Sequence, residues 1–165
     1  RICLARRLPH RGSAMTNVAP TGLARDLAAR WETDVIALKP DWLSINIGIN
    51  DVWRKYWLRL KALAETKAFT IIAHFDLPKK FGFRPTVDLD SEITAALQAV
   101  RTSGAQLELN TAGWSKPCAE PYPSPSLLKR ALALGIPILV TADAHAPKHV
   151  NRDFDKAAQL LDSLA

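Results

Sequence analysis

Cysteine, glycine and long hydrophobic runs are all scarce in this chain. Two cysteines, Cys3 and Cys118, lack the Cys-x-x-Cys spacing of a zinc knuckle and make no disulfide framework, so we expect a reducing compartment. Only seven of 165 residues are glycine, and no glycine-rich loop for nucleotide phosphates occurs. No stretch approaches the roughly 20 apolar residues of a membrane helix, and the first fifteen residues fail as a signal peptide. These absences predict a soluble, cytoplasmic protein without a membrane partner.

The positive charge of the chain is concentrated at its start. The net charge is +6, and four arginines but no acid lie among the first twelve residues. Chain ends of this composition are often disordered, and no basic-aromatic stripe indicates nucleic-acid binding. We therefore predict a disordered basic tail over residues 1–15, a single α/β domain over 16–165, and no nucleic-acid partner.

Behind the tail, helical and strand patterns alternate. Apolar residues recur at helical spacing in five segments: Leu23–Leu38, Trp53–Ala64, Leu89–Val100, Pro125–Leu134 and Phe154–Leu164. Short apolar runs predict four strands between them: Trp42–Ile49, Phe69–Ala73, Gln106–Leu109 and Pro137–Val140. Alternating helix and strand units are typical of an α/β fold. We predict a mainly parallel sheet of about four strands, which would make a partial (half) β/α barrel.

Three polar strings lie at the ends of apolar runs that predict strands. They are His74-Phe75-Asp76-Leu77-Pro78, Glu108-Leu109-Asn110-Thr111 and Asp143-Ala144-His145. The carboxyl ends of parallel strands meet at one edge of a sheet, where α/β folds build their sites. The long loops 77–87 and 111–123 also follow strands, and functional loops belong there. The sequence therefore predicts a site at this edge.

A different signature lies upstream, in Gly48-Ile49-Asn50-Asp51. With Arg25–Trp31 and Leu38–Asp41 it resembles, over about residues 24–54, the middle of SGNH (GDSL-type) esterases. That resemblance implies that Asn50 donates to an oxyanion hole, a contribution of several kcal/mol in such enzymes. The Gly-Asp-Ser nucleophile block of the family is absent, however. Without it, Asn50 capping a turn is the alternative interpretation.

From about residue 56 to 165 the chain resembles the C-terminal half of PHP-superfamily phosphoesterases, in the histidinol-phosphatase-like branch. Four strings carry this resemblance: Ile72–Gly82, Leu107–Gly113, Glu120–Pro125 and Ala142–His145. It implies that His74, Asp143 and His145 bind catalytic metal. The opening His-x-His motif of the family is missing, so the implied metal site is truncated.

The chemistry of these residues leaves alternatives open. Imidazole and carboxylate ligands suit Zn, Mn or Fe, and a bound metal would activate water for hydrolysis. Lys79 and Lys80 could attract a phosphate, as in a small phosphorylated substrate. Alternatively, neighbours or water satisfy these polar groups. Glu108 could instead be a buried carboxylate that bonds to the 111–124 loop, and Cys118 has no motif that would activate its thiol.

The sequence thus indicates a chimera of an SGNH-like part (16–54) and a PHP-like part (55–165). We expect residual divalent-metal binding and at most weak metal-dependent phosphoesterase activity. The alternatives are SGNH-type esterase activity and a non-catalytic protein recombined from environmental (metagenomic) DNA. The lost strands would leave a sheet edge open, so we expect a homodimer. Its interface would be the Trp53–Ala64 helix or the Trp42–Ile49 strand, possibly exchanged between protomers.

Overall fold

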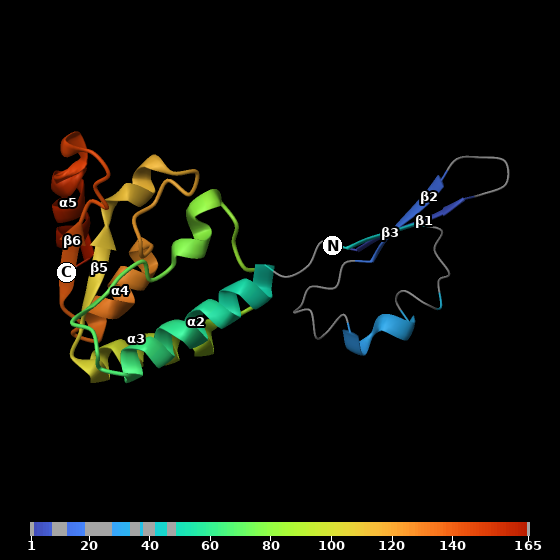
Figure 1. Ribbon diagram of the computed structural model, residues 1–165, viewed down its shortest axis with the longest axis horizontal. Coiled ribbons are helices and arrows are strands. Elements are labelled where there is room, and N and C mark those ends of the chain that lie inside the picture. The colour runs from blue at the N-terminus through green and yellow to red at the C-terminus, as the bar shows by residue number, and fades with distance from the viewer. Residues whose placement is uncertain are drawn as a thin grey trace. The chain divides into compact units, whose positions relative to one another are not determined.

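The computed structural model describes residues 2–7, 13–18, 28–33, 37, 42–45 and 49–164 (Figure 1). The chain divides into two compact units, the first formed by Arg1–Trp53 with Pro85–Asp88 and the second by Arg54–Arg84 with Leu89–Ala165. The single domain that the sequence predicts over 16–165 stays a prediction. Within the described residues, no helix is long and apolar enough to cross a membrane.

The first unit contains an antiparallel sheet in the order β2-β1-β3. Its strands are β1 (Ile2–Arg7), β2 (Ser13–Val18) and β3 (Trp42–Ile45). Strand β1 lies within the segment 1–15 that the composition predicts to be a disordered tail. Backbone ladders pair N–H and C=O groups whatever the side-chain charge, so the arginines of β1 do not prevent its pairing.

The predicted strand over Trp42–Ile49 is present as a shorter strand, but it does not belong to the parallel sheet as predicted. Strand β3 ends at Ile45 and pairs antiparallel with β1, so it is no part of the parallel sheet. An apolar run predicts a strand but not the partner of that strand. The predicted helix over 23–38 lies largely outside the described residues, although part of 28–33 is helical.

The second unit contains a parallel sheet of three strands in the order β4-β5-β6. They are β4 (Ile71–Ile72), β5 (Gln106–Asn110) and β6 (Ile138–Thr141). Between residues 49 and 164 lie four α-helices: α2 (Ile49–Glu65), α3 (Asp90–Ser103), α4 (Pro125–Ala133) and α5 (Phe154–Leu164). The predicted α/β class with a parallel sheet is confirmed, with three parallel strands where about four were expected.

Local chemistry explains where the helices begin and end. Helix α4 begins at Pro125 after Ser124, as the Ser-Pro pair predicts, since proline fits the first helical position. Helix α3 ends before Gly104, which takes a left-handed conformation with φ +76°. Glycine adopts that conformation without steric cost.

The strand β5 separates an apolar side from a polar one. Leu107 and Leu109 are fully buried, and Leu109 packs in a core cluster with Leu128 of α4 and Ala157 of α5. Figure 1 shows α5 beside β6, whose Ile138 and Val140 pack against the same cluster. Side chains alternate along a strand, so Glu108 must point away from this cluster. The carboxylate of Glu108 therefore lies on the side of the sheet opposite the apolar cluster.

Candidate functional site

The site lies at the carboxyl ends of the three parallel strands. His74 follows β4, Glu108 belongs to β5, and Thr141 is the last residue of β6. The register pairs Ile72 with Leu107, which brings His74 and Glu108, 34 positions apart in sequence, to the same edge. The predicted location of the site is thus where the structure gathers its polar side chains.

Glu108 is the centre of a hydrogen-bond network. Its Oε2 atom accepts the backbone N–H of His74 at 2.8 Å and lies 2.9 Å from His74 Nδ1. Its Oε1 atom accepts from Thr141 Oγ1 at 2.6 Å and from Asn110 Nδ2 at 3.3 Å. Glu108 is thus a buried carboxylate, as one of the two interpretations of the sequence has it, but its partners are these strand-end groups and not the 111–124 loop. A buried carboxylate is thereby satisfied on both oxygens.

The electrostatics of this pair favour its charged form. Burial alone would raise the pKa of Glu108, but hydrogen bonds from His74 and Thr141 outweigh it and lower the pKa. The hydrogen bond to Glu108 raises the pKa of His74, with burial opposing it. The carboxylate therefore accepts a hydrogen bond from the Nδ1–H group of the ring. This bond leaves Nε2 as the outward nitrogen, without a partner among the described residues.

The backbone of His74 is held in an unusual conformation. Its φ of +56° is left-handed, which is uncommon for a residue other than glycine. The hydroxyl of Tyr56 on α2 donates to the carbonyl oxygen of His74. Burial, with the charge of Asp76, raises the pKa of Tyr56 to about 12, so this hydroxyl stays a donor at neutral pH. Residues in such conformations cluster at functional sites.

Asp143 and His145 repeat part of this pattern after β6. Asp143 also has a left-handed backbone, with φ +46°, and its carbonyl accepts from His145 Nδ1 at 2.7 Å. Metal-binding histidines usually donate the other ring N–H to a carboxylate or a carbonyl, which orients the ring. Both His74 and His145 have that arrangement, with Nε2 as the remaining donor atom.

The types of ligand atom at this edge suit a divalent metal, but the arrangement of the described side chains does not yet form a metal site. Nε2 atoms and a carboxylate suit Zn, Mn or Fe. Asp143 is near enough to His74 to help raise its pKa. Among the residues that the structure describes, however, no three or more His, Cys, Asp or Glu side chains form a group that could hold a metal ion. The convergence of His74, Asp143 and His145 on a metal stays a prediction.

Asn50, the predicted oxyanion donor, is the second residue of α2 in the first unit. Its side chain is buried and bonds twice to Thr86: Oδ1 accepts from the Thr86 N–H at 2.9 Å, and Nδ2 donates to Thr86 Oγ1 at 3.0 Å. The predicted strand Trp42–Ile49 would put Asn50 just after a strand, whereas the structure has it in the first turn of a helix. The catalytic role stays a prediction, and this geometry agrees with the alternative in which Asn50 organises the local backbone.

Lys79 has a different place from the one the sequence suggested. It is fully buried and pairs with Asp76 Oδ2 at 2.7 Å and Glu120 Oε2 at 3.1 Å, and it donates to the Pro121 carbonyl at 2.7 Å. Burial raises the pKa of Asp76, while the Lys79 charge opposes that shift. Lys79 therefore joins the 77–81 turn to the loop after β5 and has no surface for a phosphate.

Cys118 also serves the loop after β5. Its thiol is partly buried and faces the carbonyls of Gly113 at 3.5 Å and Glu120 at 3.7 Å, with the Tyr122 hydroxyl at 3.9 Å. No histidine is among these partners. The part of the chain described here thus gives Cys118 no activating base.

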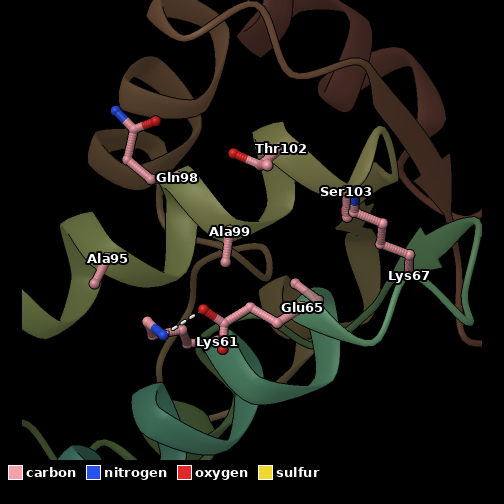
Figure 2. A pocket seen from close by; sticks show the side chains of 9 residues that line it. Lys61, Glu65, Lys67, Ala95, Gln98, Ala99, Thr102 and Ser103 are labelled. Atoms are coloured by element: carbon pink, nitrogen blue, oxygen red, sulfur yellow. Dashed lines mark hydrogen bonds and ion pairs between the residues drawn. The ribbon is translucent and has the colours of Figure 1, made fainter.

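A separate hollow lies between α2 and α3 and has a volume of about 390 Å³ (Figure 2). Its walls are alanines and short or flexible polar side chains: Lys61, Ala64, Glu65, Lys67, Ala95, Gln98, Ala99, Thr102 and Ser103. Glu65 is its one carboxylate and pairs with Lys61. With no imidazole or thiol on its walls, the hollow offers no catalytic group comparable to His74.

Known proteins resemble two parts of the chain. No family model matches it. It is 40% identical over 114 residues to a probable histidinol-phosphatase of Deinococcus radiodurans, covering 67% of this chain and 42% of that protein. It is 61% identical over 49 residues to an acetylxylan esterase of Geobacillus stearothermophilus, covering 29% of this chain and 22% of that enzyme. One chain carries likenesses to two different hydrolases.

A solved structure shares the fold. A putative histidinol phosphatase from Listeria monocytogenes superposes with a TM-score of 0.58 at 24% identity, over 66% of this chain and 44% of that one. The chain therefore has a histidinol-phosphatase-like part and an acetylxylan-esterase-like fragment. It spans about two fifths of the length of the first relative and about one fifth of the second.

Proposed function

We propose that the chain is a chimera whose remaining chemistry belongs to its PHP-like part. Its SGNH-like fragment covers about residues 24–54 and its PHP-like part about 56–165. The second part binds a divalent metal weakly and hydrolyses a small phosphomonoester at most slowly. The 40% identity to a probable histidinol-phosphatase supports the origin of this part. The likeness to an acetylxylan esterase supports the origin of the other.

The observation that carries the metal proposal is the clamp on His74. Glu108 holds Nδ1 and the backbone N–H of the same residue, so the ring is oriented before any ligand arrives. His145 is oriented in a similar way by the Asp143 carbonyl. His74, Asp143 and His145 would hold the metal, which when bound would lower the pKa of a water molecule and supply hydroxide. Glu108 positions His74 rather than binding the metal.

The proposed activity is weak for a physical reason. Metal catalysis depends on the number of ligands and on their preorganisation. Three protein ligands are the minimum of a catalytic zinc site, and the described residues do not draw three candidate side chains into one group. Binding would have to pull the ligands together, and that reorganisation would reduce the affinity.

The metal proposal is tested by His145→Ala, with Asp162→Asn on the exposed side of α5 as the control. Metal content after dialysis against Zn or Mn, measured by mass spectrometry, should fall to background in His145→Ala. The far-UV circular dichroism should not change, because His145 is exposed and outside the core. Hydrolysis of p-nitrophenyl phosphate should require added metal and disappear with EDTA. Equal metal uptake by His145→Ala and the control would refute the site.

Esterase activity of the SGNH type is a second candidate, favoured by the 61% identity over 49 residues. Against it stand the lack of a Gly-Asp-Ser string within residues 1–165 and the hydrogen bonds that engage both Oδ1 and Nδ2 of Asn50 with Thr86. We expect hydrolysis of p-nitrophenyl acetate near background. Robust esterase activity in EDTA would reverse this ordering and direct a search for a nucleophile, beginning with Cys118 and Ser44. Metal-free, inactive protein would favour the recombined, non-catalytic alternative.

A further inference from the structure

Several basic side chains gather beside the proposed metal ligands but take no part in that proposal. Lys148, His149 and Arg152 follow β6, spaced so that each lies within four residues of the next. A short 3-10 turn, Pro147–His149, compacts this segment. The N–H of His149 donates to the Ala146 carbonyl at 2.9 Å. The turn therefore confines the three residues to a short segment of chain after β6.

A third cation, beside Lys148 and Arg152, comes from another loop. Lys116 directly follows the turn Thr111–Ser115 after β5, and the hydroxyl of Thr111 donates to the carbonyl of Arg152 at 2.6 Å. This bond ties the loop after β5 to the segment after β6. Desolvation, followed by the charges of Arg152, Lys148, His145 and Lys116, lowers the pKa of His149. The cations from both loops thus act on the same imidazole.

No carboxylate neutralises these groups. Asp143 and Asp153 lie in the same stretch of chain, yet no ion pair joins either of them to Lys116, Lys148 or Arg152 in the part of the chain described here. Lys116 and Lys148 are exposed to solvent. Charges of one sign that lack partners on a common surface attract an oppositely charged ligand.

Arg152 adds a fixed donor to this surface. Its Nη2 atom donates to the Ala142 carbonyl at 3.0 Å, while its buried Nε atom has no hydrogen-bond partner. A buried guanidinium nitrogen without a partner is costly to leave unsatisfied. The guanidinium is held by a backbone carbonyl rather than a carboxylate, so its full positive charge is retained.

We propose that Lys116, Lys148, His149 and Arg152 form a binding site for a dianionic oxyanion of the phosphate type, which needs no metal. Guanidinium and ammonium groups are the preferred partners of such anions, and the carboxyl ends of parallel strands are where α/β folds bind ligands. The ligand is inorganic phosphate or the phosphoryl group of a small molecule. The site stands apart from the proposed phosphoesterase function, since binding requires neither His74 nor a metal.

The test is a titration of the whole chain with inorganic phosphate, in EDTA and at constant ionic strength. NMR chemical shifts of the backbone amides monitor the binding. Inorganic phosphate should shift the amides of 145–152 and of Lys116 and saturate in the millimolar range. Lys148→Ala and Lys116→Ala should each weaken binding about two- to fivefold, the size expected when one exposed charge interaction is lost. Lys129→Ala, an exposed lysine of α4, is the matched control and should bind as the wild type does.

Each outcome has one meaning. A parallel titration with glycerol 2-phosphate distinguishes the two possible ligands. Saturable shifts with glycerol 2-phosphate would identify the ligand as the phosphoryl group of a small molecule. Shifts with inorganic phosphate alone would identify it as free phosphate. Equal shifts with acetate, or equal weakening by Lys129→Ala, would show a general charge effect and overturn the site. The same holds if no amide of this surface moves. Metal uptake is measured on separate samples without EDTA and does not depend on this result, so the two proposals fail separately.

Discussion

At the scale of single residues, His74 is understood only through its partners. The sequence singles out His74 because it follows an apolar run, and the structure places it at the predicted edge. Its clamp by Glu108, and the support of Glu108 by Thr141, join residues 33 and 34 positions apart. Those contacts depend on the register of the parallel sheet, which the sequence pattern does not reveal.

The charged His74–Glu108 pair predicts a specific dependence of stability on pH. The pKa of His74 is raised above 6.5, so its stabilisation is present below pH 6.5 and is lost as the pH rises through the folded-state pKa. The pKa of Glu108 is lowered below 4.5, so its stabilisation is present above pH 4.5 and is lost as the pH falls through the folded-state pKa. The pair therefore contributes most between about pH 4.5 and 6.5.

We expect Glu108→Gln to lower the NMR titration midpoint of the His74 ring and to remove this stability plateau. The difference in unfolding free energy between wild type and variant, measured in urea from pH 4 to 9, should be largest between pH 4.5 and 6.5. Glu65→Gln, an exposed change on α2, should leave the midpoint unchanged. A His74 midpoint that does not move in Glu108→Gln would contradict the pair.

At the scale of elements, the loop after β5 is unusually tightly packed. Asn110 and Tyr122 exchange backbone hydrogen bonds of 2.7 and 3.0 Å, which close the loop on itself. A Cβ atom added at Gly113 would lie 2.0 Å from the carbonyl oxygen of Glu120. Glycine is required here by close backbone approach, and the loop positions Glu120 beside Lys79.

Gly113→Ala should therefore destabilise the fold by more than about 2 kcal/mol, because a backbone atom cannot move aside as a side chain can. Gly104→Ala is the comparison: its Cβ would meet nothing within 4 Å, and only the left-handed φ of +76° opposes it. That strain costs about 1–2 kcal/mol. Urea unfolding of both variants provides the measurement, and a smaller loss for Gly113→Ala than for Gly104→Ala would refute the packing argument.

At the scale of the whole molecule, the unpaired edge of the parallel sheet favours self-association. Within the described residues the sheet order leaves β4 with one neighbour, and Ile71 of that strand is 41% exposed. The sequence analysis proposed the Trp53–Ala64 helix as a dimer interface. The structure buries Trp57 of that helix and exposes Leu58 and Leu63 instead. An interface through α2 would therefore involve Leu58 or Leu63, which are five residues apart and lie on different faces of the helix.

We expect a homodimer, with a light-scattering mass of twice the 18.2 kDa of one chain. Leu58→Glu with Leu63→Glu should shift the protein to the monomer mass, because burying two added carboxylates at an interface is unfavourable. Val150→Glu, at a more exposed apolar position elsewhere, should leave the dimer intact. A mass of 18.2 kDa for the wild type across a wide concentration range would rule the dimer out.

The sequence by itself determined the local elements and the place of the candidate site. Helices from α2 to α5 and the strands of the parallel sheet follow from apolar periodicity, and Ser124-Pro125 predicts the start of α4. These features depend on neighbours within a few positions, so a linear pattern contains them. Tertiary structure alone decided that β3 pairs with β1, that Lys79 is buried between two carboxylates, and that Glu108 holds His74. Each of these is a contact between distant segments, fixed by strand register and desolvation rather than by the order of residues.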